Sequence, residues 1–139
     1  MPAMKAVFLF LACVLLAACS SLTTKHEGDL KAVKRIYVEH LLTDNYRTDY
    51  AIVEELKRLG YEASCGPLTM MPDGVDAIIS YRQRSAWDFK SYLIELDVDL
   101  KQAFTGKTLA TSRFYQPSLR TKSPEESVHT VVTSLMSKR

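Results

Sequence analysis

The pattern of apolar and polar positions is clearest in residues 91–101. Apolar side chains occupy every second position from Tyr92 to Leu100, and the intervening positions are Leu93, Glu95, Asp97 and Asp99. This alternation predicts a β-strand with one face on a core and the other toward water or a partner. Leu93 is the exception on the second face. It is either an isolated exposed residue or part of a docking patch.

A hairpin is predicted directly after this strand. Phe104-Thr105-Gly106-Lys107 fits a three-residue loop closed by glycine in the left-handed region. A shift of the pairing by one residue would bury Arg113 beside Val98, so packing and turn chemistry favour the same register. That register pairs Ala103 with Lys107, Asp99 with Thr111, Asp97 with Arg113, Glu95 with Tyr115, Leu96 with Phe114 and Val98 with Ser112.

Three further strands and two helices complete the expected elements. One helix runs from Tyr50 to Leu59, capped by Thr48 or Asp49 and followed by Gly60, and the other begins at a capping box formed by Ser123 and Glu126. Residues 82–88 are interpreted as a polar loop. The strands, which are rich in β-branched and aromatic residues, are expected at 34–41, 61–65 and 76–81.

Together these elements predict an α/β (α+β) fold in the order β-α-β-β-β-β-α. The chain offers only two helices, and the outer row of its best strand is acidic. The economical arrangement therefore has two layers, a five-stranded mixed sheet with both helices on one face. The order of the strands within the sheet does not follow from the pattern.

A short apolar run follows a single charge at the start of the chain. Lys5 precedes an unbroken apolar stretch from Ala6 to Leu16, which is too short to span a bilayer and fits a secretory signal peptide. The stretch ends in Leu16-Ala17-Ala18-Cys19, which resembles the lipobox of bacterial lipoproteins. That resemblance implies cleavage before Cys19 and lipid on its sulfur and amino group. The alternative is an ordinary secreted protein with a chance cysteine.

This reading divides the chain into a signal peptide (1–18), a lipidated flexible tether (19–31) and one α/β domain (32–139). Residues 20–30 are polar and without periodicity, which is typical of a linker that reaches about 35–40 Å when extended. Enterobacterial lipoproteins retained in the inner membrane carry an aspartate after the cysteine. Because Ser20 stands there, the resemblance implies anchoring in the periplasmic leaflet of the outer membrane.

The charge balance disfavours a nucleic-acid partner. The chain has 18 basic and 16 acidic residues, and removal of the signal peptide takes away only Lys5. A nucleic-acid binder would show a clear basic excess. Cys13 lies in the signal peptide and Cys19 would carry lipid, so Cys65 is the single thiol of the mature chain. It is interpreted as a small buried residue, or alternatively as a thiol that pairs with another protein.

Residues with catalytic potential are few. The three histidines show no metal-ligand spacing with cysteines or carboxylates, so we expect no metal and no cofactor. Asp97 and Asp99 could form a general acid/base pair, but Arg113 and Thr111 face them, which favours a solvated charge ladder. The candidate binding residues are arginines and one tryptophan, the types that anchor interfaces: Arg82, Arg84, Trp87 and Arg120. Alternatively, Trp87 covers the sheet edge and the arginines are merely solvated.

Several short segments resemble uncharacterised small proteobacterial lipoproteins. These are Glu-Glu-Leu-Lys-Arg-Leu-Gly-Tyr at 54–61, Asp-Ala-Ile-Ile-Ser-Tyr at 76–81 and Trp-Asp at 87–88. The resemblance implies no activity and supplies no site residues. The first hypothesis is a non-enzymatic interaction or envelope-assembly module with a periplasmic or outer-membrane protein partner. The alternative is a binding module for a lipid headgroup or cell-wall fragment through residues 82–87. An enzyme, the third hypothesis, requires a cleft where Cys65 or Asp97 approaches a histidine.

Overall fold

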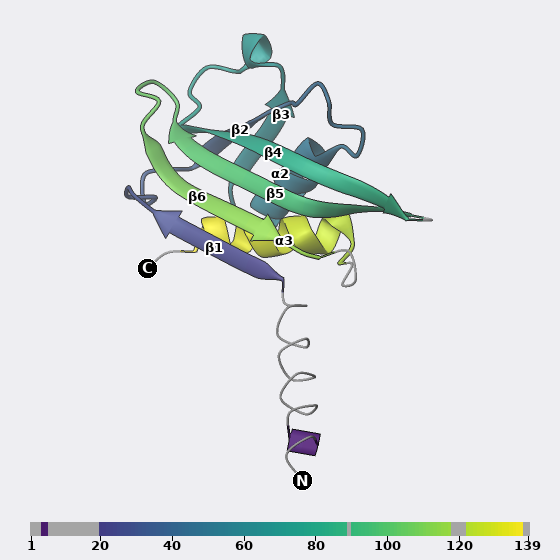
Figure 1. Ribbon diagram of the computed structural model, residues 1–139. Coiled ribbons are helices and arrows are strands. Elements are labelled where there is room, and N and C mark those ends of the chain that lie inside the picture. The colour runs from purple at the N-terminus through teal and green to yellow at the C-terminus, as the bar shows by residue number, and fades with distance from the viewer. Residues whose placement is uncertain (1–3, 6–19, 89, 118–121, 138–139) are drawn as a thin grey trace.

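The protein folds as one sheet with two helices packed against it (Figure 1). The computed structural model describes residues 4–5, 20–88, 90–117 and 122–137, and for residues 87–91 it describes no side chain. The elements are β1 (Ser21–His26), β2 (Arg35–Glu39), α2 (Thr48–Arg58), β3 (Glu62–Gly66), η1 (Leu68–Met70), β4 (Ala77–Asp88), β5 (Lys90–Gln102), β6 (Thr108–Tyr115) and α3 (Pro124–Leu135).

The sheet of the described chain has six strands in the order β1-β6-β5-β4-β2-β3. β2 is parallel to both β3 and β4, and the other neighbours are antiparallel. The predicted five strands and the order β-α-β-β-β-β-α are therefore wrong, and the observed order is β-β-α-β-β-β-β-α. The mixed sheet and the α+β class are as expected. α2 packs on β2 and β3, α3 packs on β1, β5 and β6, and the two helices contact each other.

The additional strand, β1, lies in the segment predicted to be a flexible tether. Its sequence, Ser-Leu-Thr-Thr-Lys-His, has only one large apolar residue and so gives no strand signal. Backbone pairing with β6 holds it, from Ser21 opposite Tyr115 to His26 opposite Ala110. The Thr24 hydroxyl lies 2.9 Å from that of Ser112, and the His26 ring lies 2.9 Å from the carbonyl oxygen of Leu135. The tether prediction is therefore wrong for these residues.

β4 is twice as long as expected, because the predicted polar loop at 82–88 continues the strand. Tyr81 and Gln83 point to the helix side, while Arg82 and Arg84 lie on the opposite face. The inward position at Gln83 is polar because it faces a cluster of polar groups rather than aliphatic side chains. The alternation of inward and outward positions in this part of β4 was therefore not visible as an alternation of apolar and polar residues.

Two bulges adjust the long hairpins. Ile94 has no partner on β4, and this extra residue turns Leu93 into the core, where it is 1% exposed. Both predicted roles for Leu93 are therefore wrong. In the next hairpin Gln102, rather than Ala103, pairs with Lys107, and the unpaired Leu109 restores the expected register. The five facing pairs predicted for β5 and β6 beyond the turn are confirmed.

Both helix starts are explained by capping. The Ser123 hydroxyl accepts from the Glu126 amide (3.2 Å), and the Glu126 carboxylate accepts from the Ser123 amide (3.1 Å), which confirms the predicted capping box. α2 is capped from outside, since its first amide, that of Thr48, donates to the Asp44 carboxylate (2.7 Å). Gly60, with φ of 94°, follows α2 as expected.

The core lies between the helices and one face of the sheet, and part of the other face is open. Tyr37 on β2 points to this second face but is buried, and its hydroxyl donates to the carbonyl oxygen of Pro67 (2.8 Å) in the segment after β3. The open face therefore belongs to β1, β6, β5 and β4. The core includes Ile36, Val38, Ile52, Leu56, Ile79, Leu96, Val98, Leu100, Val128, Val131 and Leu135.

Candidate functional site

Arg82 and Arg84, two of the predicted binding residues, lie side by side on the open face of the sheet. Arg84 donates to the Glu95 carboxylate across the β4–β5 pair (2.8 Å). Asp97 lies between Arg82 (3.8 Å) and Arg113 (4.0 Å). This arrangement is the predicted cross-strand charge ladder. Exposed ion pairs of this kind stabilise a fold by only about 0–1 kcal/mol each, so the ladder is chiefly a surface with both signs of charge.

A hollow of about 430 Å³ lies over this face beside β1. Its wall carries two carboxylates, a guanidinium and several hydroxyl groups, whereas Arg82 and Arg84 lie outside it. The carboxylates make it unsuited to an anionic headgroup and better suited to a neutral or cationic polar ligand. Its lining residues are Ser21, Thr23, Glu95, Asp97, Arg113, Phe114 and Tyr115.

The remaining predicted site residues fall where the structure gives no side chain. Trp87 belongs to the backbone of β4, opposite Ser91. Cys19 and Arg120 lie outside the described residues. Residues 82–87 therefore belong to a strand rather than to the predicted loop, and of the candidate side chains that the structure describes, Arg82 and Arg84 lie together.

A second hollow, of about 330 Å³, lies at the turn between β5 and β6. Val33, Val75 and Leu109 supply its apolar lining, and Lys107 is among the polar residues around it. Phe104 stands beside it and is 86% exposed. An exposed aromatic ring next to an apolar hollow is a feature of protein-binding surfaces.

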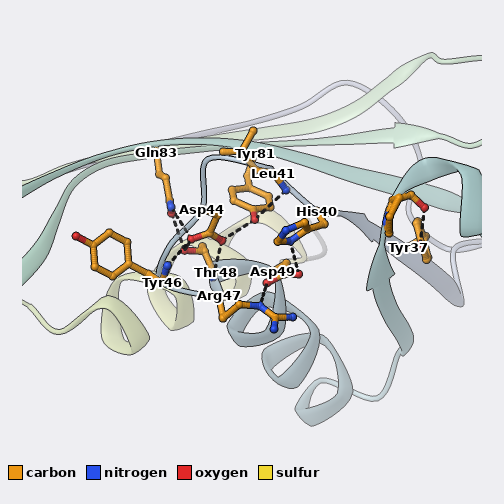
Figure 2. A network of polar contacts seen from close by, with 11 residues as sticks. Tyr37, His40, Leu41, Asp44, Tyr46, Arg47, Thr48, Asp49, Tyr81 and Gln83 are labelled. Carbon is orange, nitrogen blue, oxygen red and sulfur yellow. Dashed lines mark hydrogen bonds and ion pairs between the residues drawn. The ribbon is translucent and has the colours of Figure 1, made fainter.

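The most connected polar group lies at the start of α2 (Figure 2). The buried Asp44 carboxylate accepts from the Tyr81 hydroxyl (2.7 Å), the Thr48 and Tyr46 amides (2.7 and 2.8 Å) and the Gln83 side-chain amide (2.8 Å). Burial raises the pKa of Asp44, but these hydrogen bonds outweigh it and hold the pKa below its usual value. Asp44 therefore stays ionised and ties the segment before α2 to β4.

A second carboxylate, that of Asp49, lies next to this group. It contacts His40 Nδ1 at 2.9 Å and Arg47 Nε at 3.3 Å. Burial, together with the nearby Asp49 carboxylate, raises the pKa of Cys65 to about 11. Within the described chain, the Asp49 carboxylate thus contacts His40 and also raises the pKa of Cys65. A nucleophilic cysteine needs a thiolate near neutral pH, and this thiol remains protonated there.

Sequence reasoning did not find these two carboxylates. Asp49 was expected only as a possible helix cap, and nothing in the sequence pattern singles out Asp44. Their partners include His40, directly after β2, and Tyr81 and Gln83 of β4, so the arrangement depends on strand order. A polar residue at the inward position of β4, Gln83, was the one available signal. No group of three histidines, cysteines or carboxylates in the described residues could hold a metal ion. Likewise, none of the described helices has the length and hydropathy needed to cross a membrane.

Comparison with known proteins shows the fold and no family. No protein-family model and no curated protein matches the chain. The PelC dodecamer of Paraburkholderia phytofirmans is similar in structure, with a TM-score of 0.63, 10% identity and coverage of 87% of this chain and 100% of that one. TolB of Acinetobacter baumannii matches with a TM-score of 0.53 and 14% identity over 84% of this chain and 30% of that one. A PDZ-domain protein of Parabacteroides distasonis matches with a TM-score of 0.51 and 10% identity over 86% and 37%.

Proposed function

We propose that the protein is a lipoprotein, held through Cys19 in the periplasmic leaflet of the outer membrane, that presents a non-enzymatic domain to an envelope protein. The observation that carries this proposal is the lipobox Leu16-Ala17-Ala18-Cys19, which ends two residues before the first strand of a folded domain. A lipid on Cys19 would confine the domain to the membrane surface. We assign the protein to the small proteobacterial lipoproteins because its segments 54–61, 76–81 and 87–88 resemble theirs.

The use of the ionisable groups supports a role other than catalysis. Asp44 and Asp49 accept hydrogen bonds that join the start of α2 to its neighbours, and the Cys65 thiol stays protonated near neutral pH. Asp97 is shared between two arginines on an exposed face. Each group that the enzyme hypothesis required therefore has a structural partner.

A protein partner is favoured by the turn between β5 and β6. Phe104 is exposed there beside a hollow with an apolar lining, and aromatic side chains in such places are common anchors of interfaces. The PelC structure, which has this fold along its whole length, is a dodecamer. That assembly supports the idea that a domain of this shape uses its surface to bind protein.

The proposal is tested by fractionation and crosslinking in intact cells. Wild-type protein is expected to incorporate labelled palmitate and to sediment with the outer membrane, whereas Cys19→Ser is expected to do neither. Cys65→Ser is the matched control and should behave as wild type. A photo-crosslinker at Phe104 is expected to capture a protein that the same group at the exposed Glu54 does not. Wild-type protein that incorporates no palmitate would contradict the lipid anchor. Equal capture at Phe104 and Glu54 would contradict a docking surface at the turn between β5 and β6.

The hollow on the open face favours a second candidate function, binding of a cell-wall fragment. Its carboxylates, guanidinium and hydroxyls match the hydrogen-bonding groups of amino sugars. Titration with the neutral disaccharide of N-acetylglucosamine is expected to change the fluorescence of Trp87, the one tryptophan of the chain, and Asp97→Asn should weaken that response. An unchanged spectrum at millimolar disaccharide would eliminate this candidate.

A further inference from the structure

We propose that the end of the sheet at which β1 begins rests on the bilayer, with Leu22 and Tyr115 in contact with the lipid–water interface. The inference rests on the lipid anchor of the proposed function. It adds that the domain has one orientation on the membrane, rather than moving freely on a tether.

The length of chain between the lipid and the sheet is the first argument. Ser20 is the only residue between Cys19 and β1, which begins at Ser21. Two residue steps span at most about 7 Å. A strand whose first residue is held that close to a lipidated cysteine keeps its end of the sheet at the membrane surface.

The strand register identifies the residues at this end. Ser21 faces Tyr115, Tyr115 faces Glu95, and Glu95 faces Arg84, so these residues form one row across four strands. The hairpin of β4 and β5 continues beyond this row, as Figure 1 shows. The row marks the ends of β1 and β6 on the anchored side, beyond which β4 and β5 continue.

Exposed apolar side chains occur at this end on both faces. Tyr115 lies on the open face and is 43% exposed. Leu22 faces the helices beside Phe114 and is 40% exposed. The next residues of β1 are Thr23, Thr24 and Lys25, so the one large apolar side chain of the strand lies near its anchored end. Tyrosine is enriched where proteins meet the membrane interface, and a leucine next to it adds apolar contact.

A basic residue completes this surface. Lys122 is exposed, and its amide donates to the Gln116 side chain (3.0 Å), which places it next to the end of β6. Lysine near a bilayer keeps its ammonium group among the headgroup phosphates while its methylene groups contact apolar surface. Leucine, tyrosine and lysine together suit a zwitterionic or anionic lipid surface.

The opposite end of the sheet provides the internal reference. Thr105 lies in the turn before β6, which starts at Thr108. Seven residue steps separate Thr108 from Tyr115, about 24 Å along a strand. If the anchored end touches the bilayer, Thr105 must stand well outside the headgroups.

The experiment measures the depth of two labels on the full lipidated protein. The protein is reconstituted in vesicles of phosphatidylethanolamine and phosphatidylglycerol in a Cys65→Ser background. A fluorophore is attached at Lys122→Cys or at Thr105→Cys. Spin-labelled lipid is expected to quench the Lys122 label several-fold more than the Thr105 label, and aqueous iodide to show the reverse. Equal quenching at both positions would overturn the proposal.

Side-chain variants separate orientation from anchoring. Leu22→Ser with Tyr115→Ser is expected to reduce lipid quenching of the Lys122 label at least twofold, without loss of vesicle flotation. Leu42→Ser with Tyr50→Ser removes exposed side chains of the same kinds far from β1 and should leave quenching unchanged. Circular dichroism checks that each variant is folded. Loss of flotation in the parent protein would contradict the lipid anchor, whereas flotation with equal quenching would contradict only the orientation.

Discussion

The hydroxyl of Tyr81 donates a 2.7 Å hydrogen bond to the carboxylate of Asp44, and both groups are buried. The bond joins the middle of β4 to the segment between β2 and α2. Because the same carboxylate caps α2, one side chain connects the helix to the sheet. The position of α2 therefore depends on a polar contact as well as on core packing.

Two variants that remove this contact are expected to destabilise the fold by different amounts. Tyr81→Phe leaves Asp44 with its other donors and should lower the free energy of unfolding by about 1–2 kcal/mol. Asp44→Ala leaves several buried donors without an acceptor and should lower it by about 3 kcal/mol or more. Urea unfolding of protein that starts at Ser20 measures both. Tyr50→Phe, at an exposed tyrosine, is the matched control, and an equal effect there would contradict the account.

Stability should fall at acid pH because of the two carboxylates at α2. Hydrogen bonds hold the pKa values of Asp44 and Asp49 below the usual value near 3.8, despite the opposing effect of burial. The unfolded chain then binds protons more readily than the native protein, so native stability is present above pH 4 and is lost as the pH falls below it. Unfolding curves between pH 2 and 7 measure this loss, which should be smaller in Asp44→Asn. A pH profile unaffected by that variant would be inconsistent with an ionised Asp44.

Cys65 is expected to react slowly with alkylating reagents at neutral pH. Its pKa of about 11 results from burial and from the neighbouring Asp49 carboxylate, so the thiolate is scarce. Asp49→Asn removes the negative charge and should shift the rate-against-pH profile of iodoacetamide modification to lower pH. Lys57→Gln removes a cation that lowers the pKa and should shift the profile slightly upward. Rapid modification of the native wild type at pH 7 would rule out a protonated thiol.

The buried position of Leu93 should be visible in mutational energetics. Leu93→Ala leaves a cavity in the core and is expected to lower the free energy of unfolding by about 2–5 kcal/mol. Leu42, which is 92% exposed, is the matched control and should tolerate alanine with a change below about 0.5 kcal/mol. Thermal or urea unfolding distinguishes the two. Equal, small effects would mean that the bulge at Ile94 does not turn Leu93 inward.

Strand β1 depends on polar side chains as well as on its backbone. Thr24 bonds to the hydroxyls of Ser112 and Ser134, and Ser112 is fully buried. Thr24→Val should therefore lower the free energy of unfolding by about 1–2 kcal/mol and increase amide exchange in β1. Thr23→Val changes the exposed neighbour and should do neither. Unchanged exchange in Thr24→Val would indicate that backbone pairing alone holds the strand.

The parts of the fold that were predictable are those in which several local signals agree. For β5 and β6, alternating apolar residues and facing charges specified a register that a bulge at Leu109 then preserved. Ser123, Pro124 and Glu126 specified the start of α3 in the same way. β1 and the second half of β4 were not predicted because they lack alternating apolar side chains. Backbone pairing with β6 and β5, respectively, holds them as strands. Asp44 was missed for a related reason, because two of its hydrogen-bond donors, Tyr81 and Gln83, lie almost 40 positions further along the chain.

The candidate site was predicted only in part. Arg82 and Arg84 lie together on one exposed face, but on a strand and paired with Asp97 and Glu95, rather than in a loop. Residues 82–88 lack alternating apolar side chains, so the sequence did not show that they continue the strand and pair with β5. The exposed ring of Phe104 was hidden for a simpler reason, because it was assigned only a place in a turn.

The measurement that tests the central claim most directly is the intact mass of the mature protein extracted from membranes. We predict a chain that begins at Cys19 and carries acyl groups on that residue, with Ser20 directly before β1. A mature chain that begins at any other residue, or one that begins at Cys19 with no added lipid, would contradict the account.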